Sequence, residues 1–316
     1  MYYRQNGPIN GEIPSPLQAV WDILGDLVTD RRSRLRAALR IMGFLAMTLA
    51  LTVPYVLLYP FDGRLRQGLA RLWCRGSCAL CGLRLRIEGT PAARANTLFV
   101  ANHVSYLDIP VIGALIDAVF VAKHDVAGWP VFGPLAKLAR TIFIRRSHCK
   151  VGAQCGEIGK RLGAGDSIVF FPEGTSSDGT RVLPFKSGLF DAVVRNTPQD
   201  TPRGGGRDRL IQPISIAYSR AADGQPFLAG QESLYAWFGD MSMLPHLLTV
   251  FERDGAEVDV IFHEPFPASA FDCRKALAQA CRAIVARGVA RAHGRYLRPA
   301  LGPGIASVIS SEKSAA

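Results

Sequence analysis

Acidic residues are scarce in this 316-residue chain. It contains 26 Asp and Glu residues against 37 Lys and Arg residues, a formal net charge of +11. That excess favours an anionic partner, either a nucleic acid or the surface of an anionic membrane. The basic residues gather beside an apolar run and near the C-terminus, without a recognisable nucleic-acid-reading motif, so we expect membrane lipids as partners and no nucleic acid. A content of 48% hydrophobic residues excludes a disordered protein.

Cysteines are few and unevenly placed for a disulfide framework. The chain has seven cysteines, an odd number, and a chain of this size does not need disulfides for stability. Both observations fit a reducing compartment. Cys74, Cys78 and Cys81 follow the spacing of one helix face. A zinc site would need further ligands close by, and the sequence supplies none, so we predict a packed apolar face and no metal site.

Charge is absent from Ile41 to Phe61, a run of 21 residues. At 1.5 Å per residue it reaches about 31 Å, the thickness of a bilayer core, and it is too long and too far into the chain for a signal peptide. The run either spans the membrane or returns, because Pro54 can break the helix. Arginines on both sides (31–40 and 64–75) favour a hairpin with the amphipathic residues 65–83. A helix pair buried in a soluble core is the alternative.

The chain divides into four parts by composition. Residues 1–30, with several Pro and Gly, predict a loosely ordered lead, residues 31–83 two membrane-anchoring helices, and residues 299–316 a disordered tail. Residues 84–298 alternate between strand-like and helical patterns. This alternation predicts an α/β domain with a mixed, largely parallel sheet and flanking helices, whose ligands collect at the carboxyl ends of strands. Residues 225–248 are interpreted either as a lid or membrane face, or as an ordinary excursion packed on the core.

Residues 102–108, NHVSYLD, follow an apolar strand at 98–101. With His103 in the loop and Asp108 in the first helical turn, the two form a candidate general base and the group that orients it. Pro110, tolerated only early in a helix, supports that placement. From local sequence alone, Asp108 could equally cap the helix or close a capping box with Ser105, and His103 could be a hydrogen-bonded core residue.

Three other strand ends carry polar groups. TIFIRR ends in Arg146, and SIVFFPEGTSS places Glu173, Gly174 and Thr175 after a buried strand. Backbone N–H groups near Gly174, with Arg146, would suit an anionic head group, although a tight turn is the simpler explanation. Lys186, near the start of an expected helix at 184–196, is either another anion contact or a solvated lysine.

These blocks, in this order, resemble the lysophospholipid acyltransferase family, which contains the 1-acyl-glycerol-3-phosphate acyltransferases. The family blocks are NHxxxxD, F-I-D/E-R, FPEGT and a proline in an apolar strand. They correspond here to Asn102–Asp108, Phe143–Arg146, Phe171–Thr175 and Pro213. Two positions depart from the pattern: Arg145 replaces an acidic residue, and Ser176 stands where arginine is common.

The sequences of three segments, residues 120–133, 171–190 and 235–247, are similar to those of the bacterial branch of this family that acylates lyso-ornithine lipid. The resemblance implies a glycerol-phosphate acyltransferase-like fold, His103 and Asp108 as the catalytic pair, and an acyl thioester on acyl carrier protein or coenzyme A as donor, with no cofactor. It places the enzyme at the cytoplasmic face of the inner membrane, anchored through residues 41–61. The expected substrate-binding residues are Asn102, Ser105, Arg146, Glu173, Gly174, Thr175 and Lys186.

Three other functions stay open on the sequence. The acceptor could be 1-acyl-sn-glycerol-3-phosphate, which would give phosphatidic acid. Water could replace the lipid hydroxyl in a thioesterase or esterase, although no Gly-x-Ser-x-Gly motif supplies a protein nucleophile. A non-catalytic membrane-binding protein is the third.

Overall fold

The computed structural model describes residues 16–61, 63–93, 95–129, 132–144, 151–194, 209–227 and 231–294. Residues 1–15, Arg145, Arg146 and the expected tail at 299–316 lie outside these ranges, as does most of the loop between α6 and β6. The strands are β1 (Leu83–Glu88), β2 (Leu98–Ala101), β3 (Val119–Lys123), β4 (Ile142–Ile144), β5 (Ile168–Phe170), β6 (Leu210–Ala221), β7 (Ala256–Phe262) and β8 (Phe266–Pro267). The α-helices are α1 (Pro16–Leu57), α2 (Gly63–Leu80), α3 (Asp108–Gly113), α4 (Phe132–Leu138), α5 (Val151–Gly163), α6 (Asp191–Val194), α7 (Met243–Glu252) and α8 (Arg274–Ala292).

The sheet is mixed and largely parallel, as the alternation predicts. Its order is β1-β7-β6-β2-β5-β3-β4, with β8 beside β6. Only β6 pairs antiparallel, with β7 and β8, among the strands that the structure describes. Val100 of β2 pairs with Phe170 of β5 and with Pro213 of β6, so the segments that follow β2 and β5 leave the same edge side by side. That edge carries the candidate site.

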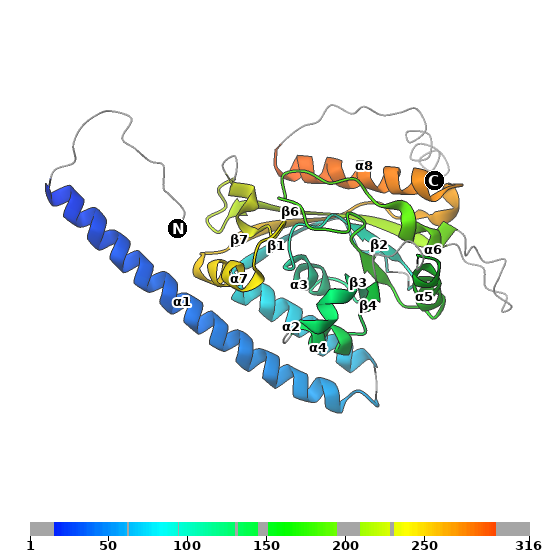
Figure 1. Ribbon diagram of the computed structural model, residues 1–316, viewed down its shortest axis with the longest axis horizontal. Coiled ribbons are helices and arrows are strands. Elements are labelled where there is room, and N and C mark those ends of the chain that lie inside the picture. The colour runs from blue at the N-terminus through cyan, green and yellow to red at the C-terminus, as the bar shows by residue number, and fades with distance from the viewer. Residues whose placement is uncertain are drawn as a thin grey trace.

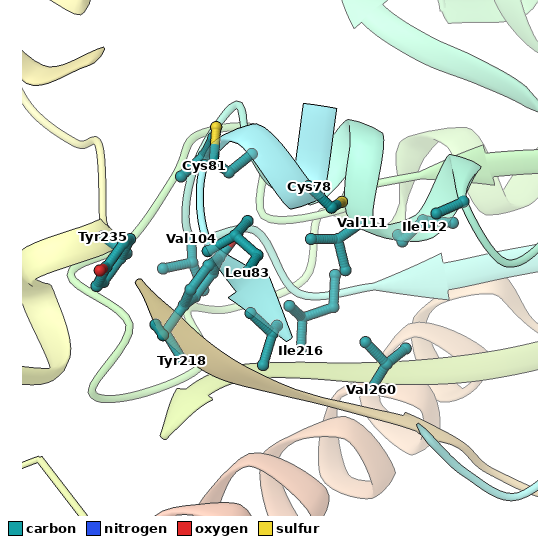
Figure 2. Close-up of a cluster of buried hydrophobic side chains, with 14 of the residues drawn as sticks. Cys78, Cys81, Leu83, Val104, Val111, Ile112, Ile216, Tyr218, Tyr235 and Val260 are labelled. Atoms are coloured by element: carbon teal, nitrogen blue, oxygen red, sulfur yellow. The ribbon is translucent and has the colours of Figure 1, made fainter. Parts of the chain in front are cut away.

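Helices cover both faces of the sheet (Figure 1). On one face α8 packs with α5 and α6 over a buried cluster that includes Leu162, Phe190 and Leu277. On the other face α2, α3 and α7 close a second cluster, in which Cys78 and Cys81 pack with Val111 and Tyr218, as Figure 2 shows. The predicted apolar cysteine face is therefore correct for these two residues.

The N-terminal hairpin consists of α1 and α2, which run beside each other below the sheet in Figure 1. Trp73 of α2 packs edge-on against Phe44 of α1 with ring centroids 5.8 Å apart, and its indole N–H donates to Thr48 Oγ1 across 3.0 Å. From Arg31 to Leu57, α1 is the one helix among the described residues that is long and apolar enough to cross a membrane.

Some local expectations are wrong. Residues 16–30, expected in a loosely ordered lead, belong to α1. At Pro54, where the sequence left a break open, α1 continues and ends one turn later at Leu57. The helix expected at 184–196 reduces to a 3-10 turn at Ser187–Phe190 followed by the single turn of α6. The strand β8 was not expected, because two residues carry no periodicity.

Candidate active site

His103 and Asp108 form a hydrogen-bonded pair at the carboxyl end of β2. His103 Nδ1 lies 2.8 Å from Asp108 Oδ2. The histidine is in the loop and Asp108 is the first residue of α3, as the sequence predicts. Because the fully buried carboxylate is an acceptor, Nδ1 carries the proton and Nε2 is left with the lone pair that a general base needs.

Asp108 organises its own loop as well as the imidazole. Oδ2 also accepts the backbone N–H groups of Val104 at 2.7 Å and Ser105 at 3.0 Å, and Oδ1 accepts the hydroxyl of Tyr218 at 3.0 Å. The N-cap position of α3 is Leu107, without a side-chain cap bond, so Asp108 is not the N-cap residue. The bond from the Ser105 N–H to Asp108 is one half of the expected capping box, while the Ser105 hydroxyl has no hydrogen-bond partner among the described residues. Four donors on one carboxylate fix the direction in which His103 faces.

The FPEGT segment holds the backbone of His103 from the other side. The backbone N–H of His103 donates to Glu173 Oε1 across 2.8 Å, and the C=O of His103 accepts the N–H of Ser177 at 2.9 Å. The imidazole stacks on Phe171, with centroids 4.2 Å apart and planes 19° from parallel. Backbone and ring are thereby restrained by a segment seventy positions later in the chain.

Glu173 braces two backbone segments from within the protein. It is 2% exposed, and its second oxygen accepts the N–H of Leu183 at 2.8 Å. Burial raises the pKa of Glu173 to about 7, although the N–H groups of His103 and Leu183 act in the opposite direction. Both oxygens already have backbone partners, which favours this bracing role, and the expected contact with substrate stays a prediction.

Asn102 and Ser105 lie buried beside His103. The Asn102 amide donates to Ile216 O at 2.9 Å and accepts from Ile216 N at 2.8 Å, which ties β2 to β6. Asn102 is 2% exposed and Ser105 is fully buried, which favours a structural role, and the substrate contacts expected for them stay a prediction. They shape the loop that carries His103.

Gly174, Thr175 and Lys186 lie together at the surface end of the site. Gly174 has φ +68°, a conformation that glycine adopts without strain, and a Cβ there would lie 2.8 Å from Lys186 Nζ. Gly174 and the exposed Thr175 line the cavity described next. The fourth expected contact, Arg146, lies outside the described residues.

An apolar cavity of about 1460 Å³ reaches from the α1–α2 hairpin to His103. Its lining comes from the hairpin, the helix after β2, the strand β3 and the FPEGT segment, and includes Leu51, Tyr55, Leu69, Trp73, His103, Ile109, Phe120, Phe171 and Trp237. A large, mainly apolar space that is lined in part by a general base suits a lipid chain whose reacting group lies beside that base.

The structure adds functional residues that the sequence did not single out. Tyr218 holds Asp108, Ser177 holds the His103 carbonyl, and Trp237 lies between the two loops. Tyr218 lies in a predicted buried strand, where a hydroxyl must find a partner, and that is the only sequence signal for it. Ser177 and Trp237 gave no such signal.

Comparison with solved structures supports the fold. The crystal structure of the 1-acyl-sn-glycerophosphate acyltransferase PlsC from Thermotoga maritima superposes with a TM-score of 0.59 at 19% sequence identity. The match covers 84% of this chain and 100% of that chain. At this identity the likeness speaks for the architecture alone.

Sequence comparison identifies the family. The Acyltransferase family model matches residues 84–217. The chain is 41% identical over 230 residues to a lyso-ornithine lipid O-acyltransferase of Rhizobium meliloti, covering 72% of this chain and 77% of that protein. A protein of the same name from Brucella abortus is 36% identical over 249 residues, 78% and 90% of the two chains. A 1-acyl-sn-glycerol-3-phosphate acyltransferase of Neisseria gonorrhoeae is 37% identical over 123 residues, 38% and 48% of the two. With its NHxxxxD and FPEGT blocks assembled at one sheet edge, the chain belongs to the lysophospholipid acyltransferase family.

Proposed function

We propose that this enzyme is a membrane-bound O-acyltransferase that moves a fatty acyl group from an acyl thioester to the hydroxyl of lyso-ornithine lipid. The observation that carries the proposal is the bond between His103 and Asp108 at the wall of an apolar cavity. The relatives named lyso-ornithine lipid O-acyltransferase, which match over most of this chain, support the choice of acceptor.

His103 acts as the general base. Nε2 takes the proton of the acceptor hydroxyl while the oxygen attacks the thioester carbonyl, and Asp108 stabilises the imidazolium that forms. The tetrahedral intermediate then expels the thiolate, which receives the proton from Nε2. The products are an ester and a free thiol, and the nucleophile belongs to the lipid. Acyl carrier protein and coenzyme A both supply such a thioester.

The head group of the acceptor lies at the Gly174 end of the site. An ornithine carboxylate there would be met by Lys186, whose Nζ lies over Gly174, and by Thr175. Arg146, which the sequence also predicts as a contact, lies outside the described residues. The ammonium group of ornithine needs another partner than Glu173, since that carboxylate is occupied by His103 and Leu183.

The hairpin lies in one leaflet of the bilayer and does not cross it. α2 packs along α1, and it carries Arg64, Arg66, Arg71 and Arg75. If α1 crossed the membrane, these arginines would enter the hydrocarbon, at a cost of about 2.5–3.5 kcal/mol each near its centre. Lying at the cytoplasmic surface, α1 buries its apolar side while the arginines reach lipid phosphates.

The test uses purified protein in mixed micelles with acyl carrier protein and coenzyme A thioesters, and with lyso-ornithine lipid and 1-acylglycerol-3-phosphate in parallel. We expect ester formation on lyso-ornithine lipid, and a fall of about 10²- to 10⁴-fold for His103→Ala. His124→Ala, at an exposed histidine outside the cavity lining, is the matched control and stays near the wild-type rate.

Three results would contradict the proposal. Preference for 1-acylglycerol-3-phosphate would move the enzyme to phosphatidic acid synthesis. Free fatty acid released without any lipid acceptor would make it a thioesterase. A wild-type rate in His103→Ala would remove the histidine from the mechanism.

A further inference from the structure

Trp237 joins the two loops that build the site. Its backbone N–H donates to the carbonyl of Val104, in the NHVSYLD loop, across 3.0 Å. Its own carbonyl accepts the hydroxyl of Ser176, the residue after FPEGT. Trp237 lies in the loop between the 3-10 turn Gln231–Tyr235 and α7, within the stretch 235–247 that resembles the lyso-ornithine branch. One residue from a third segment of the chain therefore contacts both loops.

The indole of Trp237 is held by neighbouring aromatic rings at the wall of the reaction cavity. It lines the same cavity as His103. Its ring packs edge-on against Tyr106, with centroids 5.9 Å apart, and against Trp129, 5.8 Å apart. The Tyr106 hydroxyl is itself bonded to Nδ1 of the buried His246 at 2.9 Å. Contacts on two sides and a backbone tied at both ends keep the indole at this wall.

The indole N–H of Trp237 is buried and has no hydrogen-bond partner within the part of the chain that the structure describes. A buried Trp N–H normally finds a partner, and leaving one without costs free energy. Because Trp237 lines the cavity that receives the substrate, a small shift of the ring on binding would bring this donor to an oxygen of the substrate.

The chemistry of the acceptor names that oxygen. Ornithine has amines and a carboxylate but no hydroxyl, so the hydroxyl that is O-acylated belongs to the chain already amide-linked to ornithine. The amide carbonyl then lies on the same chain as the reacting hydroxyl. Resting on the proposed function, we propose that the Trp237 indole N–H donates to the amide carbonyl of an N-acyl amino acid acceptor and aligns its hydroxyl with His103.

Trp237→Phe tests this because phenylalanine keeps an aromatic wall and removes only the donor and one ring. For lyso-ornithine lipid we expect kcat/KM to fall about 5- to 10-fold, mainly through KM, as for loss of one hydrogen bond to a neutral partner. For 1-acylglycerol-3-phosphate, whose ester carbonyl is a weaker acceptor than an amide, any side activity should fall less than 2-fold. An equal fall on both acceptors would overturn the assignment and leave a packing role.

A second measurement does not depend on the variant folding well. The chain has four tryptophans, so the indole N–H signals of the ¹⁵N-labelled, detergent-solubilised enzyme can be assigned. Adding lyso-ornithine lipid should move the Trp237 indole proton downfield, and a single-chain detergent without an amide should not. An unmoved signal at saturating acceptor would overturn the contact. If the wild-type enzyme does not acylate lyso-ornithine lipid at all, the proposed function is wrong. If the wild-type enzyme acylates it and Trp237→Phe does so equally well, only the role of Trp237 is wrong.

Discussion

The carboxylate of Glu173 accepts the backbone N–H of His103 across 2.8 Å, and this bond links two sequence blocks 70 positions apart. The bond exists because β2 and β5 are parallel neighbours, so the loops that follow them leave the sheet together. The glutamate of FPEGT therefore acts on the reaction through the position of the base. Its charge state then affects folding as well as catalysis.

Glu173 should make stability depend on pH between about 4.5 and 7. Its pKa is raised from 4.5 to about 7 by burial, so the folded state holds a proton that the unfolded chain has lost in this interval. The stability contribution is complete below pH 4.5 and is lost as the pH rises through 7. Denaturant unfolding of the detergent-solubilised protein at several pH values measures it.

Glu173→Gln should flatten that pH dependence and lower the unfolding free energy by about 1–3 kcal/mol, because the amide NH₂ would face a backbone N–H donor. It should also reduce kcat, since the His103 backbone loses its support. Glu157→Gln, at an exposed position of α5, is the control and should change neither quantity. A pH profile unchanged in Glu173→Gln would show that another group titrates.

Asp108 and Tyr218 should separate orientation of the base from support of the carboxylate. In Asp108→Asn the amide NH₂ group would face N–H donors, either those of Val104 and Ser105 or that of His103 Nδ1, and the charge that stabilises the imidazolium would be lost. We therefore expect kcat to fall by about 10²- to 10⁴-fold. Tyr218→Phe removes one donor to Oδ1 and leaves the imidazole bond intact, so kcat should fall less than 10-fold. Equal losses in the two variants, at equal protein stability, would contradict this division of roles.

The fold was predictable from the sequence because its signals are local. Each β-rich run between residues 83 and 262 became a strand, and the apolar run with its arginine-rich partner became the hairpin. The contact between His103 and Asp108 was also predicted, but local sequence alone left a helix cap and a core histidine open, and the family resemblance decided between them.

The roles of the neighbouring residues were not predictable, because they depend on which loops adjoin. Asn102 and Glu173 were expected to touch substrate, yet their partners are backbone groups of β6 and of the loops at His103 and Leu183. Trp237 comes from a third segment, and no local pattern shows that it lies between the other two. The order of the strands in the sheet decides which loops adjoin and therefore which contacts form. That order cannot be read from the sequence of any single segment.

The outer face of α1 should be the main membrane contact. Leu39, Met42 and Leu49 lie on one stripe of this helix and are 59%, 65% and 70% exposed. Each of these side chains gains roughly 1.5–3 kcal/mol when it is buried in the lipid surface, and replacing all three with serine removes that gain. We expect a large loss of co-flotation with vesicles that contain anionic lipid.

The control for this surface is Ile87→Ser, at a 55% exposed position of the edge strand β1, which should float like the wild type. High salt should weaken flotation of both proteins, because the arginines beside the stripe bind anionic head groups. If the triple serine variant still floated in high salt, the membrane contact would lie elsewhere.

Gly288 of α8 should be intolerant of a side chain. A Cβ there would overlap Ser215 and would lie 2.8 Å from His263 Nε2. These two groups are fixed, since Ser215 Oγ is bonded to His263 Nε2 at 2.8 Å and to Val285 O at 2.9 Å. Gly288→Ala should therefore lower the unfolding free energy by about 1–3 kcal/mol through overpacking between α8 and β6.

Gly156→Ala in α5 provides the matched comparison for Gly288→Ala. Both glycines lie inside helices, but Gly156 is exposed and a Cβ there would meet nothing within 4 Å. Helix propensity alone then acts, and it should stabilise the protein by about 0.5–1 kcal/mol. Opposite signs in thermal melts of the two variants are expected. Equal stabilisation by both would mean that α8 can move away from the sheet, and that the Ser215–His263 bond does not fix its distance.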